Sequence, residues 1–180
     1  MRIIAGRWAG RSLMSPAGRV RPTAEPVREA MMELIADDLV GARIVDLFAG
    51  TGALGLEALS RGAKYCDFVE NGPSALHSLK ANVAALRVGE KARIYDRDAI
   101  PFVERLAPDR YDIALVDPPY GSRKLDRVVQ YWQRVPFSTI LVFEHMVEHE
   151  GLPRGVTRRF GDTSVTLLRT RRKRAPRQVP

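Results

Sequence analysis

The sequence has one cysteine, no apolar run long enough to cross a bilayer, and no apolar signal-type segment near its start. A spanning helix needs about 20 mostly apolar residues, so membrane insertion is not expected. Cys66 has no partner for an intramolecular disulfide, and it falls in an apolar run where a core residue is expected. These absences favour a cytoplasmic protein. The 180 residues suffice for one domain with its own core.

Positive charge is concentrated at the two ends of the chain. Residues 1–28 carry six arginines and one glutamate, and residues 154–180 carry eight arginines, one lysine and one aspartate. Because the whole chain has a net charge of +8, the residues between these ends are net acidic. Basic ends around an acidic body favour a polyanionic partner, such as a nucleic acid, over a tail that only aids solubility.

Alternating strand and helix patterns after residue 41 predict a Rossmann-like, doubly wound α/β fold. We expect parallel strands at residues 43–48, 65–70, 92–95, 111–116 and 139–144. Helices are expected between them, near residues 53–61, 73–87, 99–106 and 124–133. Two further runs, residues 155–160 and 163–169, flank a Gly-Asp turn and predict a closing antiparallel hairpin. The predicted sheet is therefore mostly parallel and has seven strands.

The residues before this domain are expected to form an extension that packs on it. Apolar residues among glycines predict a short β-ribbon within residues 1–20, which would expose Arg2, Arg7 and Arg11. Helical spacing then predicts a helix that begins near Thr23 and ends near Asp38. We thus divide the chain into an extension, residues 1–40, a main domain, residues 41–169, and a basic tail of disordered composition, residues 170–180.

A glycine-rich turn follows the first strand of the main domain. Gly50 and Gly52 can adopt φ/ψ values that other residues avoid, and they let a ligand approach the backbone closely. The N–H groups at the start of the next helix face the same space. The run Asp46-Leu47-Phe48-Ala49-Gly50-Thr51-Gly52 resembles motif I of S-adenosylmethionine-dependent methyltransferases. In that class the loop, including Phe48 and Ala49 here, wraps the methionine part of the cofactor.

Four carboxylates stand at the ends of successive predicted strands, where ligands of open α/β sheets bind: Asp46, Glu70, Asp98 and Asp117. Glu70, followed by Asn71, is suited to accept two hydrogen bonds from a ribose diol. Asp98 is suited to the adenine amino group, with the Ala99 N–H directed at the ring. Asp46 either orients the glycine loop or meets the ammonium group of the methionine part. For each of these residues the alternative is a local role in a cap or turn.

Asp117-Pro118-Pro119-Tyr120 is the most specific motif in the chain. Two prolines fix the backbone and remove two donors, which leaves the Asp117 side chain and the Pro118 carbonyl as acceptors. Such acceptors suit an exocyclic amine of a nucleobase, because holding its N–H groups turns the lone pair toward a methyl donor. The ring face of Tyr120 is suited to stack on the base, which must be flipped or single-stranded. This chemistry needs no metal ion.

One stretch of the sequence has the residue spacing of a zinc-binding motif. His145-Met146-Val147-Glu148-His149 matches the inverted zinc pattern H-x-x-E-H. It directly follows a predicted strand and soon meets Gly151 and Pro153, which leaves little helix to bring both histidines to one face. We therefore expect no metal site.

Taken together, these segments are similar to one family, the bacterial RsmD-type 16S ribosomal RNA guanine-N2 methyltransferases. The resemblance extends to Arg169 and is carried by residues 2–6, Arg21-Pro22-Thr23, residues 46–63 and Asp117-Pro118-Pro119-Tyr120. It implies a class I enzyme that moves a methyl group from S-adenosylmethionine to guanine N2 in 16S ribosomal RNA or the small ribosomal subunit. It also leads us to expect Arg21, Thr23 and Arg28 beside the cleft for the target base. A monomer is expected, because nothing in the sequence demands a dimer.

Three other readings remain open at this point. A DNA adenine-N6 or cytosine-N4 methyltransferase would use the same Asp-Pro-Pro-Tyr motif, although no separate domain for reading DNA is visible. A non-catalytic RNA-binding or assembly factor could share the fold, but the intact acidic set argues against lost chemistry. A nicotinamide oxidoreductase is disfavoured by Asp46 before the turn and by the closing hairpin. The target nucleotide and the role of the tail are not given by the sequence.

Overall fold

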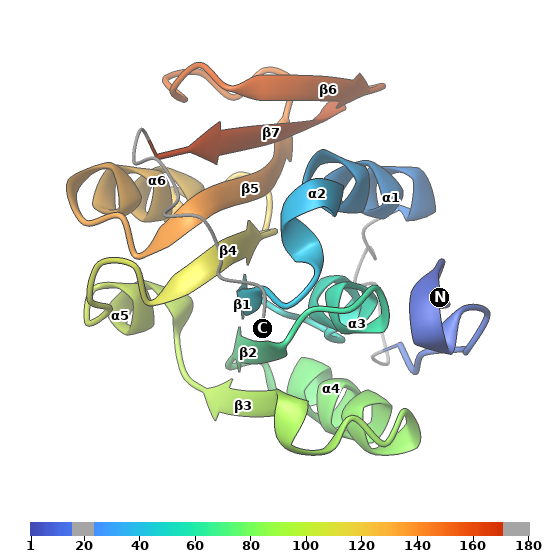
Figure 1. Ribbon diagram of the computed structural model, residues 1–180. Helices are drawn as coiled ribbons and strands as arrows, with labels where there is room; N and C mark the ends of the chain where they lie inside the picture. Colours follow the sequence, from blue (N-terminus) through green and yellow to red (C-terminus); the bar gives the residue numbers. More distant parts are fainter. Residues whose placement is uncertain (16–23, 171–180) are drawn as a thin grey trace.

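The computed structural model describes residues 1–15 and 24–170 and forms a seven-stranded sheet in the order β3-β2-β1-β4-β5-β7-β6 (Figure 1). Strands β1 to β5 are parallel, β7 is antiparallel to β5, and β6 pairs antiparallel with β7. The predicted fold class, with its closing hairpin, is confirmed. The strands are β1 (Arg43–Leu47), β2 (Tyr65–Glu70), β3 (Ala92–Asp96), β4 (Tyr111–Val116), β5 (Ser138–Met146), β6 (Val156–Phe160) and β7 (Thr163–Arg169).

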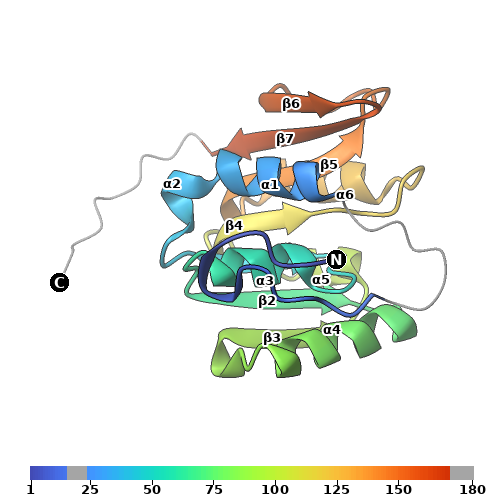
Figure 2. The same ribbon diagram turned by 90° about the vertical axis from the view of Figure 1, so that its right-hand side faces the viewer.

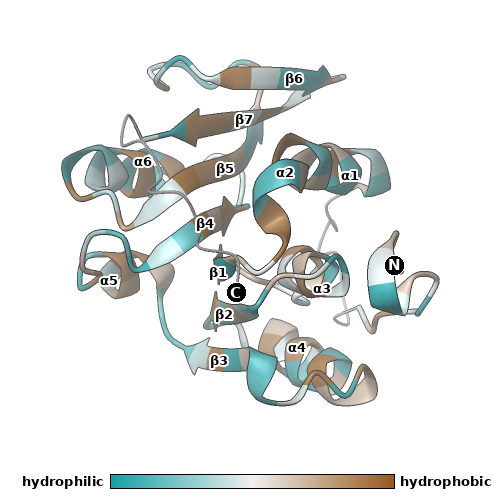
Figure 3. Cartoon of the chain, in the orientation of Figure 1, coloured by the Kyte–Doolittle hydropathy of each residue, from teal (hydrophilic) through white to brown (hydrophobic). Residues whose placement is uncertain are grey.

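Helices cover both faces of the sheet. Figure 1 shows α1 (Glu25–Leu34), α2 (Ala36–Leu39), α3 (Ala53–Ser60) and α4 (Pro73–Ala85) on one side, and α5 (Ala99–Val103) and α6 (Lys124–Arg134) on the other. The strand period of two divides the buried side chains between two cores. On β4, for example, Ile113 and Leu115 pack toward α1–α4, whereas Ala114 and Val116 pack toward α5 and α6. In Figure 3 the inner strands β5 and β7 are accordingly mostly hydrophobic.

The N-terminal segment forms only a minimal version of the β-ribbon that the sequence predicts. It holds one isolated bridge, between Arg2 and Ser12, and a 3-10 helix, η1 (Gly6–Trp8). Backbone hydrogen bonds join the two arms, for example from the Ile3 N–H to the Arg11 carbonyl at 2.9 Å. Side chains of α3 add to them, because Glu57 accepts from the N–H groups of Ile4 and Ala5, at 2.7 and 2.9 Å. Figure 2 shows the segment running beside α3. Buried polar groups of the main domain thus fix the extension.

The helix expected to end near Asp38 is interrupted. Ile35, with φ −110° and ψ 6°, leaves the helical region and separates α1 from α2. The side chains of Met31, Met32, Ile35 and Leu39 remain in the core that α1–α4 cover. No helix in residues 1–15 and 24–170 is long and apolar enough to span a membrane.

Candidate active site

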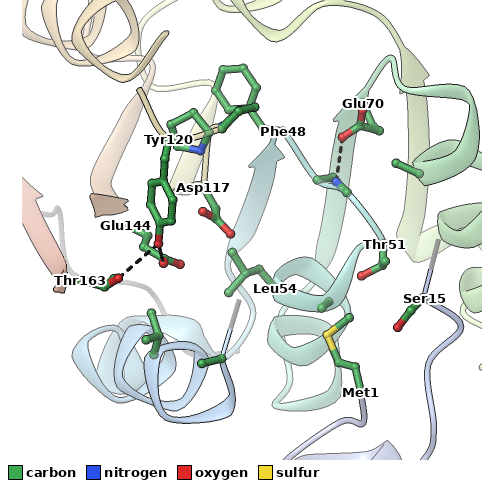
Figure 4. Close-up of a pocket in the computed structure, with 18 of the residues that line it drawn as sticks. Met1, Ser15, Phe48, Thr51, Leu54, Glu70, Asp117, Tyr120, Glu144 and Thr163 are labelled. Atoms are coloured by element: carbon green, nitrogen blue, oxygen red, sulfur yellow. Dashed lines mark hydrogen bonds between the residues drawn. The ribbon is translucent and has the colours of Figure 1, made fainter. Parts of the chain in front are cut away.

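A pocket of about 650 Å³ lies beyond the carboxyl ends of the central strands. Its wall combines the loop after β1, the ends of β2, β4 and β5, the start of β7, helix α1 and the N-terminal segment, which contributes Met1 and Ser15 (Figure 4). Among the predicted site residues, those that line this pocket are Phe48, Ala49, Gly50, Glu70, Asn71, Asp117, Pro118, Pro119 and Tyr120. The fold therefore brings the glycine loop and the Asp-Pro-Pro-Tyr motif to one cavity.

The three glycines of the loop have different structural roles. Gly50, with φ +55°, borders the pocket and has open space where a Cβ atom would stand. Gly52, with φ +79°, is the N-cap of α3 and does not line the pocket, so its contact with the cofactor stays a prediction. A Cβ atom at Gly55 would lie 2.4 Å from Phe68 Cε1, so this glycine permits α3 to pack on β2. Phe48 also has positive φ, at 60°.

Asp46 holds the first turn of α3, the helix that follows the glycine loop. Its Oδ2 accepts from the Gly55 N–H at 2.9 Å, the side chain is buried, and the residue does not line the pocket. Burial raises the pKa of the Asp46 carboxyl well above its usual range. The Gly55 bond works against this rise, and the nearby carboxylates of Asp117 and Glu70 add to it.

Glu70 joins the loop after β2 to the glycine loop. Its Oε2 accepts from the Gly50 N–H at 2.8 Å, and its Oε1 accepts from the N–H groups of Asn71 and Gly72, at 2.9 and 2.7 Å. The carboxylate thereby fixes the shape of the turn that faces the pocket (Figure 4). Because a carboxylate offers about four lone-pair positions and three backbone N–H groups bind to it here, about one position remains for a ligand hydroxyl.

Asp98 and Ala99 lie away from this pocket. Asp98 is the N-cap of α5, where its Oδ1 accepts from the Ile100 N–H at 2.9 Å. Ala99 is buried, and neither residue lines the pocket. The structure thus gives Asp98 the local capping role that the sequence analysis names as its alternative.

Tyr120 is held by its hydroxyl group as well as by its backbone. The hydroxyl donates to Glu144 Oε1 and lies 3.3 Å from Thr163 Oγ1, while the ring remains 42% exposed (Figure 4). Burial and the bond to Glu144 raise the pKa of Tyr120 to about 12, so the hydroxyl stays protonated at neutral pH. Nearby, Lys124 Nζ lies 5.5 Å from the centroid of the Phe48 ring.

Glu144 is a pocket residue that the sequence analysis misses. It lies on β5, is 5% exposed and lines the pocket beside Asp117. The rule that found the other carboxylates would have found it, because Glu144 also stands near the carboxyl end of a parallel strand. In the sequence analysis it stands only as the last residue of the strand predicted at residues 139–144.

The predicted RNA-binding arginines fall into two groups. Arg2, Arg7 and Arg11 are exposed on the N-terminal segment, and Arg2 also pairs with Glu25 at 3.2 Å. Arg28 is buried, and its Nη2 donates to the Arg2 carbonyl at 2.7 Å, so its expected place beside the cleft is wrong. Burial lowers its pKa, while Glu57 and Glu25 oppose that shift. Arg21 and Thr23 lie outside the described residues.

The two histidines of the zinc-like pattern have other partners. His145 Nε2 is 2.9 Å from Thr166 Oγ1, and His149 Nε2 is 2.7 Å from Asp126 Oδ1. Among the residues that the structure describes, no group of three or more His, Cys, Asp or Glu could hold a metal ion.

Solved structures define the class of protein to which this fold belongs. An Escherichia coli structure described provisionally as a methyltransferase matches with a TM-score of 0.81 and 32% sequence identity. The match covers 93% of this chain and 96% of that one. The fold is thus that of the Rossmann-like methyltransferases.

Sequence comparison identifies the family within this class. It belongs to the family described as Conserved hypothetical protein 95, which matches residues 1–167. A Bacillus subtilis protein named provisionally as an rRNA methyltransferase is 35% identical, over 95% of this chain and 100% of that protein. The Ribosomal RNA small subunit methyltransferase D of Escherichia coli is 38% identical, over 72% of this chain and 65% of that protein. The family resemblance that the motifs carry is confirmed.

Proposed function

We propose that this protein transfers a methyl group from S-adenosylmethionine to the exocyclic N2 of a guanine in small-subunit ribosomal RNA. One observation carries the proposal, namely that Asp117-Pro118-Pro119-Tyr120 and the glycine loop line the same pocket. The names of the relatives support ribosomal RNA as the substrate, since the Escherichia coli relative is a small subunit methyltransferase. The antiparallel hairpin of β6 and β7 supports a methyltransferase rather than a dinucleotide-binding enzyme.

The charge of the pocket wall suits this cofactor. Glu70, Asp117 and Glu144 line the pocket, and Lys124 is the one basic residue among its described lining. An acidic wall attracts the positively charged sulfonium and ammonium groups of S-adenosylmethionine and disfavours a pyrophosphate. The spacing of Gly50, Gly52 and Gly55 equally fits the dinucleotide fingerprint G-x-G-x-x-G, so the carboxylates are more informative than the glycines.

Each part of the cofactor then has a candidate partner. We assign the ribose diol to Glu70 and the methionine part to the loop of Phe48, Ala49 and Gly50. Asp98 and Ala99 stay our candidates for the adenine, which would have to extend beyond the pocket described above. When bound, S-adenosylmethionine supplies an electrophilic methyl group.

The protein's own groups act on the target amine. The Asp117 carboxylate and the Pro118 carbonyl accept from its N–H groups, and the ring of Tyr120 supports the face of the base. The lone pair of N2 is thereby directed at the methyl carbon. Methyl transfer would leave N2 positively charged until it releases a proton, for which the Asp117 carboxylate is the adjacent acceptor. Placed acceptors stabilise that developing charge.

The test is methyl transfer by purified protein, with labelled S-adenosylmethionine and either small-subunit RNA or assembled particles. Digestion to nucleosides is expected to yield N2-methylguanosine. A DNA duplex in a parallel reaction tests the competing amine substrates. Label in adenine or cytosine would contradict the guanine assignment, and no label in any nucleic acid would favour a binding protein.

The basic tail is expected to bind RNA without a part in the chemistry. Deleting residues 170–180 should weaken RNA binding and lower its salt slope by about one for each lost phosphate contact. A matched control keeps the length of the tail and replaces its basic residues by glutamine. These residues are Arg171, Arg172, Lys173, Arg174 and Arg177. Both variants should bind cofactor as the native protein does. An unchanged salt slope would show that the tail does not contact RNA.

A further inference from the structure

Two carboxylates stand side by side on the pocket wall. Val116 of β4 pairs with Phe143 of β5, so the residues that follow them, Asp117 and Glu144, occupy neighbouring positions. Adjacent strands are separated by about 4.8 Å. Both residues line the pocket, and Figure 4 shows both close to the ring of Tyr120. One base could therefore meet both carboxylates along a single edge.

The Glu144 side chain is buried and held in place. It is 5% exposed, and the Tyr120 hydroxyl that donates to its Oε1 also lies near Thr163. A carboxylate can accept about four hydrogen bonds, so the bond from Tyr120 does not exhaust its capacity.

We propose that Glu144 selects guanine by accepting from the ring N1–H while Asp117 and Pro118 hold the neighbouring N2 amine. This inference rests on the proposed function, because it takes the N2 amine to lie at Asp117. On the Watson–Crick edge of guanine, the amine is next to a ring N–H donor. In adenine and cytosine, the ring nitrogen beside the amine is an acceptor. Its lone pair would face the carboxylate, and two buried acceptors would lack a donor.

In this proposal the recognition of an amine and the choice among bases are made by different residues. The motif recognises an exocyclic amine, which adenine, cytosine and guanine all carry. A site built to hydrogen-bond one particular group rejects analogues that lack it much more strongly than a merely apolar pocket does. Glu144 supplies such a group at the position next to the amine.

The experiment compares two bases at the target guanine position, which is first located by mapping the methylated RNA. Small-subunit RNA is prepared with guanine or with 2,6-diaminopurine there; the analogue keeps the N2 amine but has a lone pair at N1. The readout is the ratio of kcat/KM for the two RNAs. The native protein should prefer guanine by about 5- to 150-fold, the range for one unsatisfied buried group. Glu144→Gln should bring the ratio toward one, because its amide can donate to N1.

Tyr120→Phe is the matched control, since it removes the hydroxyl that contacts Glu144 and keeps the carboxylate. It should lower the rates and preserve the ratio. If the native protein has equal kcat/KM values for the two RNAs, the proposal is overturned before any variant is measured. A ratio unchanged in Glu144→Gln would also overturn it and would leave Glu144 as a support for Tyr120. If that variant does not fold, Glu144→Met takes its place. Failure of the native protein to methylate guanine N2 would instead refute the proposed function.

Discussion

Replacing Asp117 by alanine is expected to lower the single-turnover rate of methyl transfer by about a hundred- to a thousandfold, the usual cost of one placed polar group. The side chain lines the pocket directly after β4. Its loss removes an acceptor for the target amine and leaves the backbone of the Pro-Pro turn intact. The measurement is single-turnover methylation of small-subunit RNA or particles at saturating cofactor.

The control for this experiment is Asp37→Ala, which removes an exposed carboxylate on α2 outside the pocket lining. It should transfer methyl groups at the native rate. Cofactor affinity should be retained in Asp117→Ala, because Glu70 and the glycine loop are untouched. Native-rate transfer by Asp117→Ala would refute the amine-alignment mechanism.

Replacing Glu70 by alanine is expected to weaken binding of S-adenosylmethionine by about 1–3 kcal/mol, the range for an unsatisfied buried partner. Two effects add, because the ribose loses its acceptor and the Gly50 N–H loses the bond that shapes the loop. Calorimetry on the purified protein measures the affinity. Glu90→Ala, at an exposed position in η2 (Gly89–Lys91) outside the pocket, serves as the matched control.

The Glu70 variants also separate the two effects. Glu70→Gln keeps one acceptor oxygen and should retain an intermediate affinity. Unchanged affinity in Glu70→Ala would remove Glu70 from the cofactor site and limit it to its observed role in the loop.

The sheet could be predicted from the sequence because its strands are short apolar runs between turn residues. Each predicted strand overlaps an observed one, and the Gly161-Asp162 turn correctly indicated the closing hairpin. The N-terminal segment was predicted less closely, because its β pairing is limited to one bridge. Its conformation depends on Glu57 and Ser60, which are more than forty residues away in sequence. Tertiary contacts with buried polar side chains leave no local pattern.

The candidate site was predicted where the motif itself fixes the chemistry, at Asp117-Pro118-Pro119-Tyr120 and around Gly50. Sequence reasoning was weaker where position alone carried the assignment. The family resemblance predicts Arg28 beside the cleft, yet it lies in the interior beneath the N-terminal segment. The stacking role predicted for Tyr120 concerns its ring alone, whereas its hydroxyl bonds to Glu144. The proximity of Glu144 follows from the pairing of β4 with β5, which the sequence does not show.

Mass mapping of nucleosides in small-subunit ribosomal RNA, from cells with and without this gene, tests the central claim most directly. The account predicts that one guanosine loses its N2-methyl group when the gene is absent. Restoring the native gene should restore that methyl group, and restoring the Asp117→Ala form should not. Identical N2-methylguanosine maps in both strains would contradict the claim.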